Sequence, residues 1–302
     1  MTEPRCSAIS RTVGEDLHGT ASIVRRWLLV EQPGPWGSEA LTESDLPSGV
    51  AEVLAIRGRA HRVRVLLLRR PDRPDRTAAE GRQCFVASSA RHRTWVEQRL
   101  VADPSELLAV DFERLGAGEP PGFGDPHVGP LYLVCTNGRH DPCCAQIGRP
   151  VARSLVNERS DAVWEVSHIG GDRFAGNLVC LPHGIYYGRL GPGEARDAVD
   201  AYENGRIVLD YYRGRAGDPF VVQAAECFVR QEAGLLGVDD LHPTWRRAGA
   251  PGRFDIGFDA GDGRRFEVGV AVGRASEGRP ITCLSRGLEH PPEYSLVSIR
   301  TA

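Results

Sequence analysis

The sequence contains no lysine, and all 37 of its basic side chains are arginine. This bias is typical of a GC-rich genome and by itself indicates no mechanism. The chain is not basic overall, because its formal net charge is −3. A nucleic-acid-binding surface needs an excess of positive charge to neutralise phosphates, so the charge argues against nucleic acid as the main partner.

Long apolar runs are also missing. No stretch of about 18 apolar residues occurs, and residues 1–19 lack the apolar core of a signal peptide. We therefore expect a cytoplasmic protein with no membrane partner. Hydrophobic residues make up 41% and charged residues 25% of the 302-residue chain, which are ordinary globular values. This length allows two or three domains, each with its own core.

Eight cysteines are present, but no two of them form the C-x2-C pair that is typical of zinc knuckles. In a reducing compartment we do not expect a disulfide framework. Residues 131–190 gather four of the cysteines and three histidines, which predicts metal or redox chemistry in that stretch; they are Cys135, Cys143, Cys144, Cys180, His140, His168 and His183. Outside it, Cys6 is interpreted as a frayed terminal thiol, and Cys84, Cys227 and Cys283 as core residues.

The order of apolar runs is repeated along the chain. Buried strands are predicted at 27–32, 62–69 and 83–89, with helical patterns at 46–57 and 105–115. After a Gly/Pro-rich linker at 116–130, residues 131–136, 163–170 and 177–184 repeat the pattern of 27–32, 65–72 and the segment around 83–89. In this comparison Glu31 stands in the place of Cys135, so only the second half has the reactive residues.

The pattern changes near residue 216. Residues 218–236 predict an amphipathic helix with Asp218 as N-cap and Pro219 at the first helical position. Alternating residues around Asp262-Gly263 predict a β-hairpin, and Cys283 is expected in a late strand. We therefore predict an α/β fold with two similar halves at 1–115 and 131–215, joined by the linker 116–130 and followed by a small α+β appendage at 216–302.

The second half places cysteines at a strand end and at a predicted helix N-terminus. Cys135 ends a strand, and Asp141-Pro142 predicts the N-cap and first position of a helix that begins with Cys143 and Cys144. The helix dipole lowers the pKa of thiols in that turn, which suits a nucleophile or a metal ligand equally well. His168-x3-Asp172 follows the next strand in a loop that contains Gly170-Gly171, where the backbone can approach a cofactor closely.

Three segments together resemble a known family. CTNGRHDPCC, SHIGGDRFAGN and LPHGIYYGRL are similar to the signature blocks of the sucrase/ferredoxin-like family, a branch of the thioredoxin-like [2Fe-2S] ferredoxins. The resemblance spans about residues 20–215. It implies two tandem thioredoxin-like halves, the first degenerate, and a [2Fe-2S] cofactor. The implied cluster ligands are Cys135, Cys144, His168 and Asp172, with Cys143 as an alternative ligand; Asp172 departs from the family's cysteine or histidine.

This resemblance implies a one-electron carrier rather than an enzyme, with a reductase or an oxygenase-type acceptor as redox partner. Two other functions stay open at this point. One is a thiol redox enzyme that uses Cys135 with Cys143 or Cys144, and the other is a non-catalytic adaptor with a structural metal. The sequence shows no paired carboxylates in a glycosidase context, so nothing supports a sucrase activity.

Overall fold

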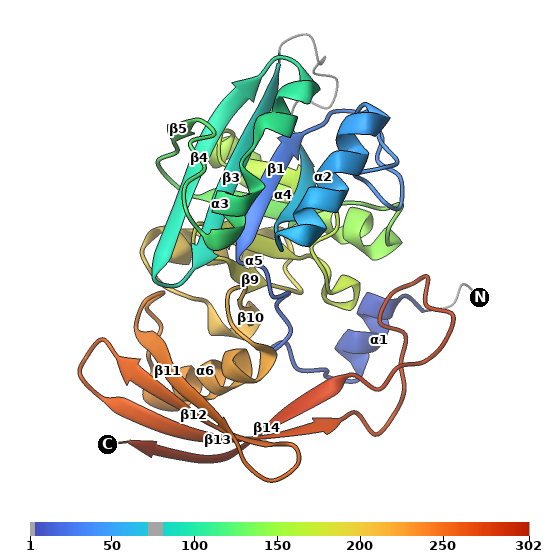
Figure 1. Cartoon of the computed structure of the whole chain (residues 1–302). Coiled ribbons are helices and arrows are strands. Elements are labelled where there is room, and N and C mark those ends of the chain that lie inside the picture. The colour runs from blue at the N-terminus through green and yellow to red at the C-terminus, as the bar shows by residue number, and fades with distance from the viewer. Residues whose placement is uncertain (1–3, 72–80, 302) are drawn as a thin grey trace.

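A computed structural model describes residues 4–71 and 81–301 of the chain (Figure 1). The fold is mixed α/β, with one large curled sheet and a second, smaller sheet. The large sheet has ten strands in the order β10-β9-β8-β6-β7-β2-β1-β3-β4-β5. It therefore runs without interruption through both halves that the sequence predicts.

Each half builds its part of the sheet in the same way: a strand, a helix and a parallel strand are followed by two antiparallel strands. In the first half these elements are β1 (Arg26–Glu31), α2 (Ser48–Ala60), β2 (Arg64–Arg69), β3 (Arg82–Ala90) and β4 (Arg93–Val101). In the second half they are β6 (Leu131–Cys135), α4 (Pro142–Arg159), β7 (Val163–Val166), β8 (Leu178–Leu181) and β9 (Ile185–Tyr187).

The register of the strands relates the two halves directly. Glu31 pairs with Leu68 between β1 and β2, just as Cys135 pairs with Val166 between β6 and β7. Leu68 and Val166 also pair with each other where β2 and β7 join the halves in antiparallel fashion. The predicted correspondence of Glu31 with Cys135 is therefore confirmed; residue 72, the end of the compared segment 65–72, lies outside the described residues.

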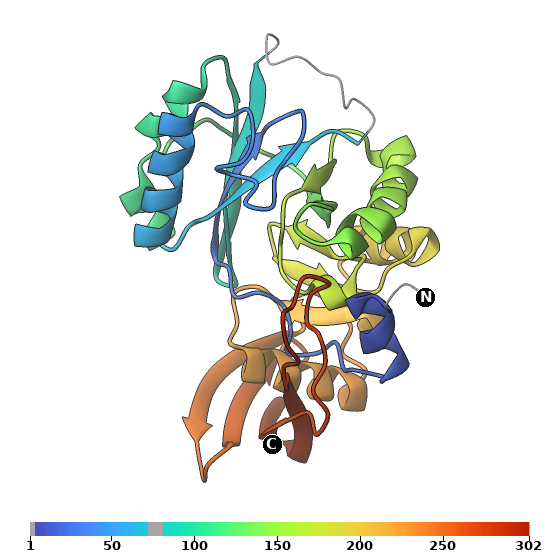
Figure 2. The same cartoon turned by 90° about the vertical axis from the view of Figure 1, so that its right-hand side faces the viewer.

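Apolar residues are buried on both faces of the large sheet. The inner face gathers side chains from both halves, and the Phe85 and Trp164 rings meet edge to face with centroids 5.7 Å apart. The outer face of the first half is covered by α2, while α4 and α5 (Pro192–Glu203) cover that of the second half (Figure 2). Helices packed on a face of the sheet bury its apolar side chains, as is usual in α/β proteins.

Connecting elements differ from the predictions in detail. The predicted helix at 105–115 is two pieces, the 3-10 helix η2 (Pro104–Ala109) and the short α3 (Phe112–Ala117), because Asp111 caps a new helix by accepting a hydrogen bond from the Arg114 N–H. Within the predicted linker lies the two-residue strand β5 (Asp125–Pro126). The remaining connections hold the 3-10 helices η3 (Asp172–Phe174) and η4 (Leu209–Tyr211).

The last part of the chain forms a separate layer. After β10 (Tyr212–Arg215), the helix α6 (Phe220–Ala233) packs on a four-stranded antiparallel sheet of β11 (Leu241–Ala248), β12 (Arg253–Ala260), β13 (Arg265–Arg274) and β14 (Pro292–Thr301). The hairpin predicted around Asp262-Gly263 is confirmed as the β12–β13 turn. The helix start is off by one residue, because Pro219 is its N-cap.

The N-terminal segment and the loop 275–291 both pack against the second half. The helix α1 (Cys6–Thr12) lies against η3, and the loop 275–291 between β13 and β14 rises beside α1 in both views (Figures 1 and 2). Glu15 fixes this arrangement, since its carboxylate accepts from Arg173 at 2.8 Å and from Arg279 at 3.0 Å. Residues 6–15 are therefore a packed part of the fold.

Candidate functional site

The candidate residues meet at the carboxyl ends of the parallel strands β6 and β7. Cys135 is the last residue of β6, Cys144 lies in the first turn of α4, and His168 follows β7 by two residues. As predicted, Asp141 is the N-cap of α4: its Oδ1 accepts from the Cys143 N–H at 2.8 Å, and a proline follows at the first helical position. Parallel strands and a helix N-terminus thus bring three donors to one edge of the sheet.

The spacing of the donor atoms suits a common metal ion. One donor atom from each of Cys135, Cys144 and His168 lies within 4.8 Å of the other two. Two donors bound at about 2.0–2.3 Å to one ion are at most about 4.6 Å apart, so small side-chain adjustments would bring all three to a single ion. Both cysteines are 1% exposed, whereas the His168 side chain is 26% exposed at the rim.

Asp172 reaches the same site. Its Oδ1 lies 3.0 Å from His168 Nδ1 and accepts from the Cys144 thiol at 3.2 Å. The His168 Nδ1 therefore faces the Asp172 carboxylate at ion-pair distance, although the two atoms are not aligned as a regular hydrogen bond. A carboxylate beside an imidazole is the usual means of orienting a metal-binding histidine.

His140 also belongs to this site, although the sequence analysis did not select it. Its ring stacks on His168 with centroids 3.7 Å apart, and its Nε2 lies 3.6 Å from Asp172 Oδ2. His140, His168 and Asp172 form a second group of possible ligands. The only signal for it in the sequence was its position in the turn before Asp141, because the stacking with His168 depends on how two distant loops meet.

The pKa values of the four site residues depend on one another. A hydrogen bond from Cys144 lowers the pKa of Cys135 to about 5 against the effect of burial, and it raises that of Cys144 far above the ordinary value. Burial alone would lower the pKa of His168, but Asp172 and Cys135 outweigh it and raise that pKa to about 9. Burial likewise opposes ionisation of Asp172, yet His168 holds its pKa below the usual value. The site therefore contains a thiolate beside a thiol and a histidine that is readily charged.

The loop that presents His168 is fixed by backbone geometry. Gly170 and Gly171 have φ of 94° and 83°, which L side chains rarely adopt. Arg213 fills the space against Gly171, and its guanidinium donates to the Gly170 carbonyl at 3.0 Å and to Asn177 Oδ1 at 2.8 Å. The predicted loop is therefore confirmed, and the groups that approach these glycines closely are Arg213 and, at Gly170, Ser22.

Cys143 lies in a different cluster. Its side chain leaves α4 in another direction from that of Cys144, because neighbouring helical residues point about 100° apart. Its sulfur meets those of Cys6 and Cys283 at 3.7 and 3.4 Å. The prediction of a frayed Cys6 is wrong, since that residue is 1% exposed. Cys283 lies in a turn of the loop 275–291, not in a strand, because β14 begins only at Pro292.

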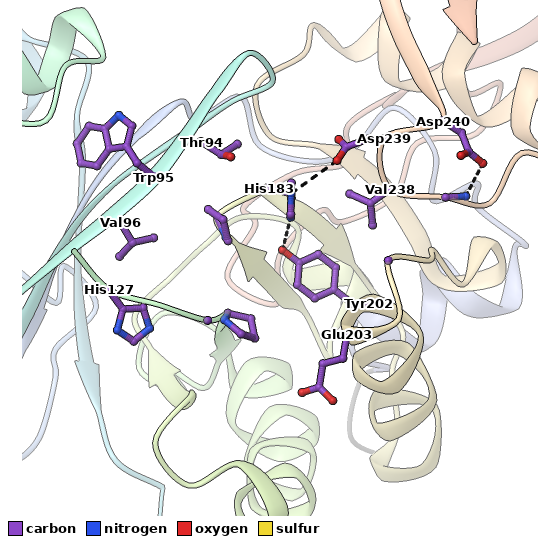
Figure 3. A pocket seen from close by; sticks show the side chains of 15 residues that line it. Thr94, Trp95, Val96, His127, His183, Tyr202, Glu203, Val238, Asp239 and Asp240 are labelled. Carbon is purple, nitrogen blue, oxygen red and sulfur yellow. Dashed lines mark hydrogen bonds and ion pairs between the residues drawn. The ribbon is translucent and has the colours of Figure 1, made fainter. Parts of the chain in front are cut away.

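A wide cavity lies elsewhere in the described part of the chain. It has a volume of about 750 Å³ and is lined by Thr94, Trp95, His127, His183, Tyr202 and Asp239, among others (Figure 3). His183 lies between the Tyr202 hydroxyl and Asp239 in this cavity. None of the candidate cysteines lines it. The candidate cysteines therefore lie outside this cavity, in a compact cluster of side chains.

Comparison with known proteins gives the family. Residues 17–214, about two thirds of the chain, match the sucrase/ferredoxin-like family. The chain belongs to this family. The match contains both halves of the large sheet and every residue of the Cys135–Cys144–His168 group, while the four-stranded sheet lies outside it. The predicted family is therefore confirmed.

Curated relatives of this sucrase/ferredoxin-like chain carry the name Altered inheritance of mitochondria protein 32. The protein of Debaryomyces hansenii is 35% identical over 120 residues, which cover 36% of this chain and 40% of the relative. The protein of Meyerozyma guilliermondii is 32% identical over 95 residues, which cover 28% of this chain and 34% of the relative. The chain thus matches between about a third and two fifths of these relatives' length. No solved structure matches it significantly.

These comparisons correct the predicted function. The relatives are named for the inheritance of mitochondria, and their names describe neither a [2Fe-2S] protein nor an electron carrier. The prediction of a one-electron carrier is therefore wrong, because it transferred a ferredoxin's role from short signature blocks. The [2Fe-2S] cofactor and the redox partners, a reductase or an oxygenase-type acceptor, stay predictions. No helix among the described residues has the length and apolar character needed to span a bilayer.

Proposed function

We propose that this chain is a transition-metal-binding protein whose centre is held by Cys135, Cys144 and His168, with Asp172 as the adjacent oxygen donor. The observation that carries the proposal is the convergence of two sulfurs and an imidazole nitrogen within 4.8 Å from three separate elements. Thiolate and imidazole together favour zinc, iron or copper over magnesium or calcium. A bound ion would supply a positive charge that keeps both thiols deprotonated.

The surrounding residues prepare the site for a metal. The Cys135 carbonyl packs on Gly148 of α4, so the strand end and the helix approach each other closely. Asp172 orients His168 from the buried side, and the ring of His140 covers His168 at the rim. Such outer groups fix the ligand rotamers before a metal binds.

Metal analysis of the full chain tests this proposal. Protein purified without oxygen and without chelators is expected to hold a transition metal in a constant ratio to the chain. Cys135→Ala and Cys144→Ala are each expected to reduce that metal by at least about tenfold, because each removes one of three donors.

Cys84→Ala and Cys227→Ala are the matched controls, because these thiols are also buried, Cys84 in the core of the first half and Cys227 on α6. They should leave the metal content unchanged. An unchanged metal content in folded Cys135→Ala protein would contradict the proposal. Acid-labile sulfide measured in the same samples decides whether the predicted [2Fe-2S] cofactor is present.

We also infer that the two halves are thioredoxin-like and that the protein is cytoplasmic. The strand orders β2-β1-β3-β4 and β7-β6-β8-β9, each with a parallel central pair and an antiparallel hairpin, support the first inference. The eight free cysteines support the second, because a reducing compartment keeps thiols such as Cys135 and Cys144 unpaired.

A further inference from the structure

A second cluster of sulfur atoms lies next to the proposed centre and shares none of its residues. It joins Cys6 of α1, Cys143 of α4 and Cys283 of the loop 275–291, which are far apart in the chain. The three Sγ–Sγ distances are 3.7 Å between Cys6 and Cys143, 3.4 Å between Cys143 and Cys283, and 3.5 Å between Cys283 and Cys6. The sulfurs therefore form a nearly equilateral triangle.

Asp141 adds an oxygen to this triangle. Its Oδ2 lies 3.6 Å from Cys6 Sγ and accepts from the Cys283 N–H at 2.6 Å, while its Oδ1 accepts from the Cys143 N–H. The carboxylate is fully buried and held by backbone donors from two segments. All four side chains have donor atoms within 4.8 Å of one another.

The size of the triangle matches that of a metal–thiolate site. Sulfurs bound at about 2.3 Å to a tetrahedral ion are about 3.8 Å apart, close to the three distances measured here. A disulfide requires an S–S distance of about 2.05 Å and joins only two sulfurs, so it would leave one of the three thiols without a partner. Three thiols and a carboxylate oxygen instead make a complete four-donor set.

We propose that Cys6, Cys143, Cys283 and Asp141 form a second metal site, which takes a thiophilic divalent cation of the zinc type. This site goes beyond the centre at Cys135, Cys144 and His168. It joins α1, the first turn of α4 and the loop beside α1, which Figure 2 shows next to each other. A metal at this position links residues that are more than a hundred positions apart in the chain. Because the site exists only in the folded state, metal binding stabilises that state, and tighter binding stabilises it more.

Cation counting on the full chain tests the site. Reduced, metal-stripped protein is titrated with Zn²⁺ against a chromophoric chelator, and with Co²⁺ to record thiolate-to-cobalt absorption. We expect two bound Zn²⁺ in the wild-type chain and one in Cys6→Ser or Cys283→Ser. Cys227→Ser, the matched buried thiol, should keep two. Equal Zn²⁺ counts in Cys283→Ser and wild type would overturn the second site.

The same titration separates this site from the proposed centre. Loss of one Zn²⁺ in Cys283→Ser with no loss in Cys135→Ala supports the second site and contradicts the first. Loss of one Zn²⁺ in Cys135→Ala with no loss in Cys283→Ser supports the centre at Cys135 and contradicts the second site.

A measurement on the wild-type chain does not depend on the folding of variants. Bound Zn²⁺ should protect Cys6 and Cys283 from iodoacetamide at least about tenfold, as read by peptide mass spectrometry. Removal of Zn²⁺ should abolish the protection, while Cys227 should react equally with and without metal. Equal labelling in both states of Cys283, the partly exposed thiol of the three, or a disulfide between two of the three cysteines in freshly purified protein, would overturn the proposal.

Discussion

Two adjacent residues, Cys143 and Cys144, contribute to different clusters. Cys144 donates to Asp172 at 3.2 Å, and Cys143 accepts from the Ser7 hydroxyl at 3.1 Å. The helical turn separates their side chains, so one short segment of α4 serves two groups of possible ligands. At this scale, a residue's role follows from the direction of its side chain more than from its position in a motif.

His140 offers a test at the scale of one residue. His140→Ala is expected to weaken metal binding at the Cys135–Cys144–His168 site by about 10- to 100-fold without abolishing it, because the stacked ring orients His168 but is not one of its three donors. Competition with a chelator measures the affinity. His92→Ala is the control, since it removes one ring of another stacked pair, His92–His242. Complete loss of metal in His140→Ala would instead make His140 a ligand.

At the scale of elements, the site depends on how closely α4 approaches β6. The helix begins at Pro142, after the loop 136–141 that follows Cys135, and it packs against the strand end with Gly148 against the Cys135 carbonyl. A Cβ at Gly148 would overlap that oxygen. The backbone of α4 therefore lies closer to the strand end than any other residue type would permit.

Gly148→Ala is expected to destabilise the fold by about 1–3 kcal/mol, because the added methyl group must push α4 away from β6. The same shift should weaken metal binding at Cys135 and Cys144. Denaturant unfolding measures the first effect and chelator competition the second. Gly193→Ala in α5 is the control: no atom lies within 4 Å of its added Cβ, so stability should stay equal or rise by up to about 1 kcal/mol. Equal stability of the two variants would refute the close-approach argument.

At the scale of the whole molecule, the N-terminal segment and the loop 275–291 both pack against the second half. An ion triad joins three segments: buried Glu15 of the N-terminal segment pairs with partly buried Arg173 of η3 and with buried Arg279 of the loop 275–291. Burial raises the pKa of Glu15, but the two arginines outweigh it and hold that pKa below its usual value. The folded state therefore favours the ionised carboxylate.

Glu15→Gln is expected to destabilise the protein by about 1–3 kcal/mol at neutral pH, because two arginines lose a charged partner. The folded pKa of Glu15 is below its unfolded value, so its stabilisation is fully present above about pH 5 and is lost as the pH falls through the folded pKa. Unfolding curves of wild type and variant should therefore converge on acidification. Glu277→Gln, an exposed change in the same loop, is the control. A pH-independent difference between wild type and Glu15→Gln would contradict the role of the carboxylate.

Local patterns in the sequence determined the elements of this protein. Apolar runs predict β1, β2, β6 and β7, Asp141-Pro142 predicts the start of α4, and three motifs identify the family. These features depend on neighbours within a few residues, where period, capping and turn chemistry act. The correspondence of Glu31 with Cys135 was visible for the same reason, because both halves repeat one local pattern.

Only the tertiary structure decided which distant side chains meet. Cys6 and Cys283 are 277 positions apart, yet their sulfurs lie 3.5 Å from each other. His140 stacks on His168 because the loops after two parallel strands converge at one edge of the sheet. Such contacts follow from the packing of α1 and the loop 275–291 on the second half, and no period or spacing along the chain encodes that packing.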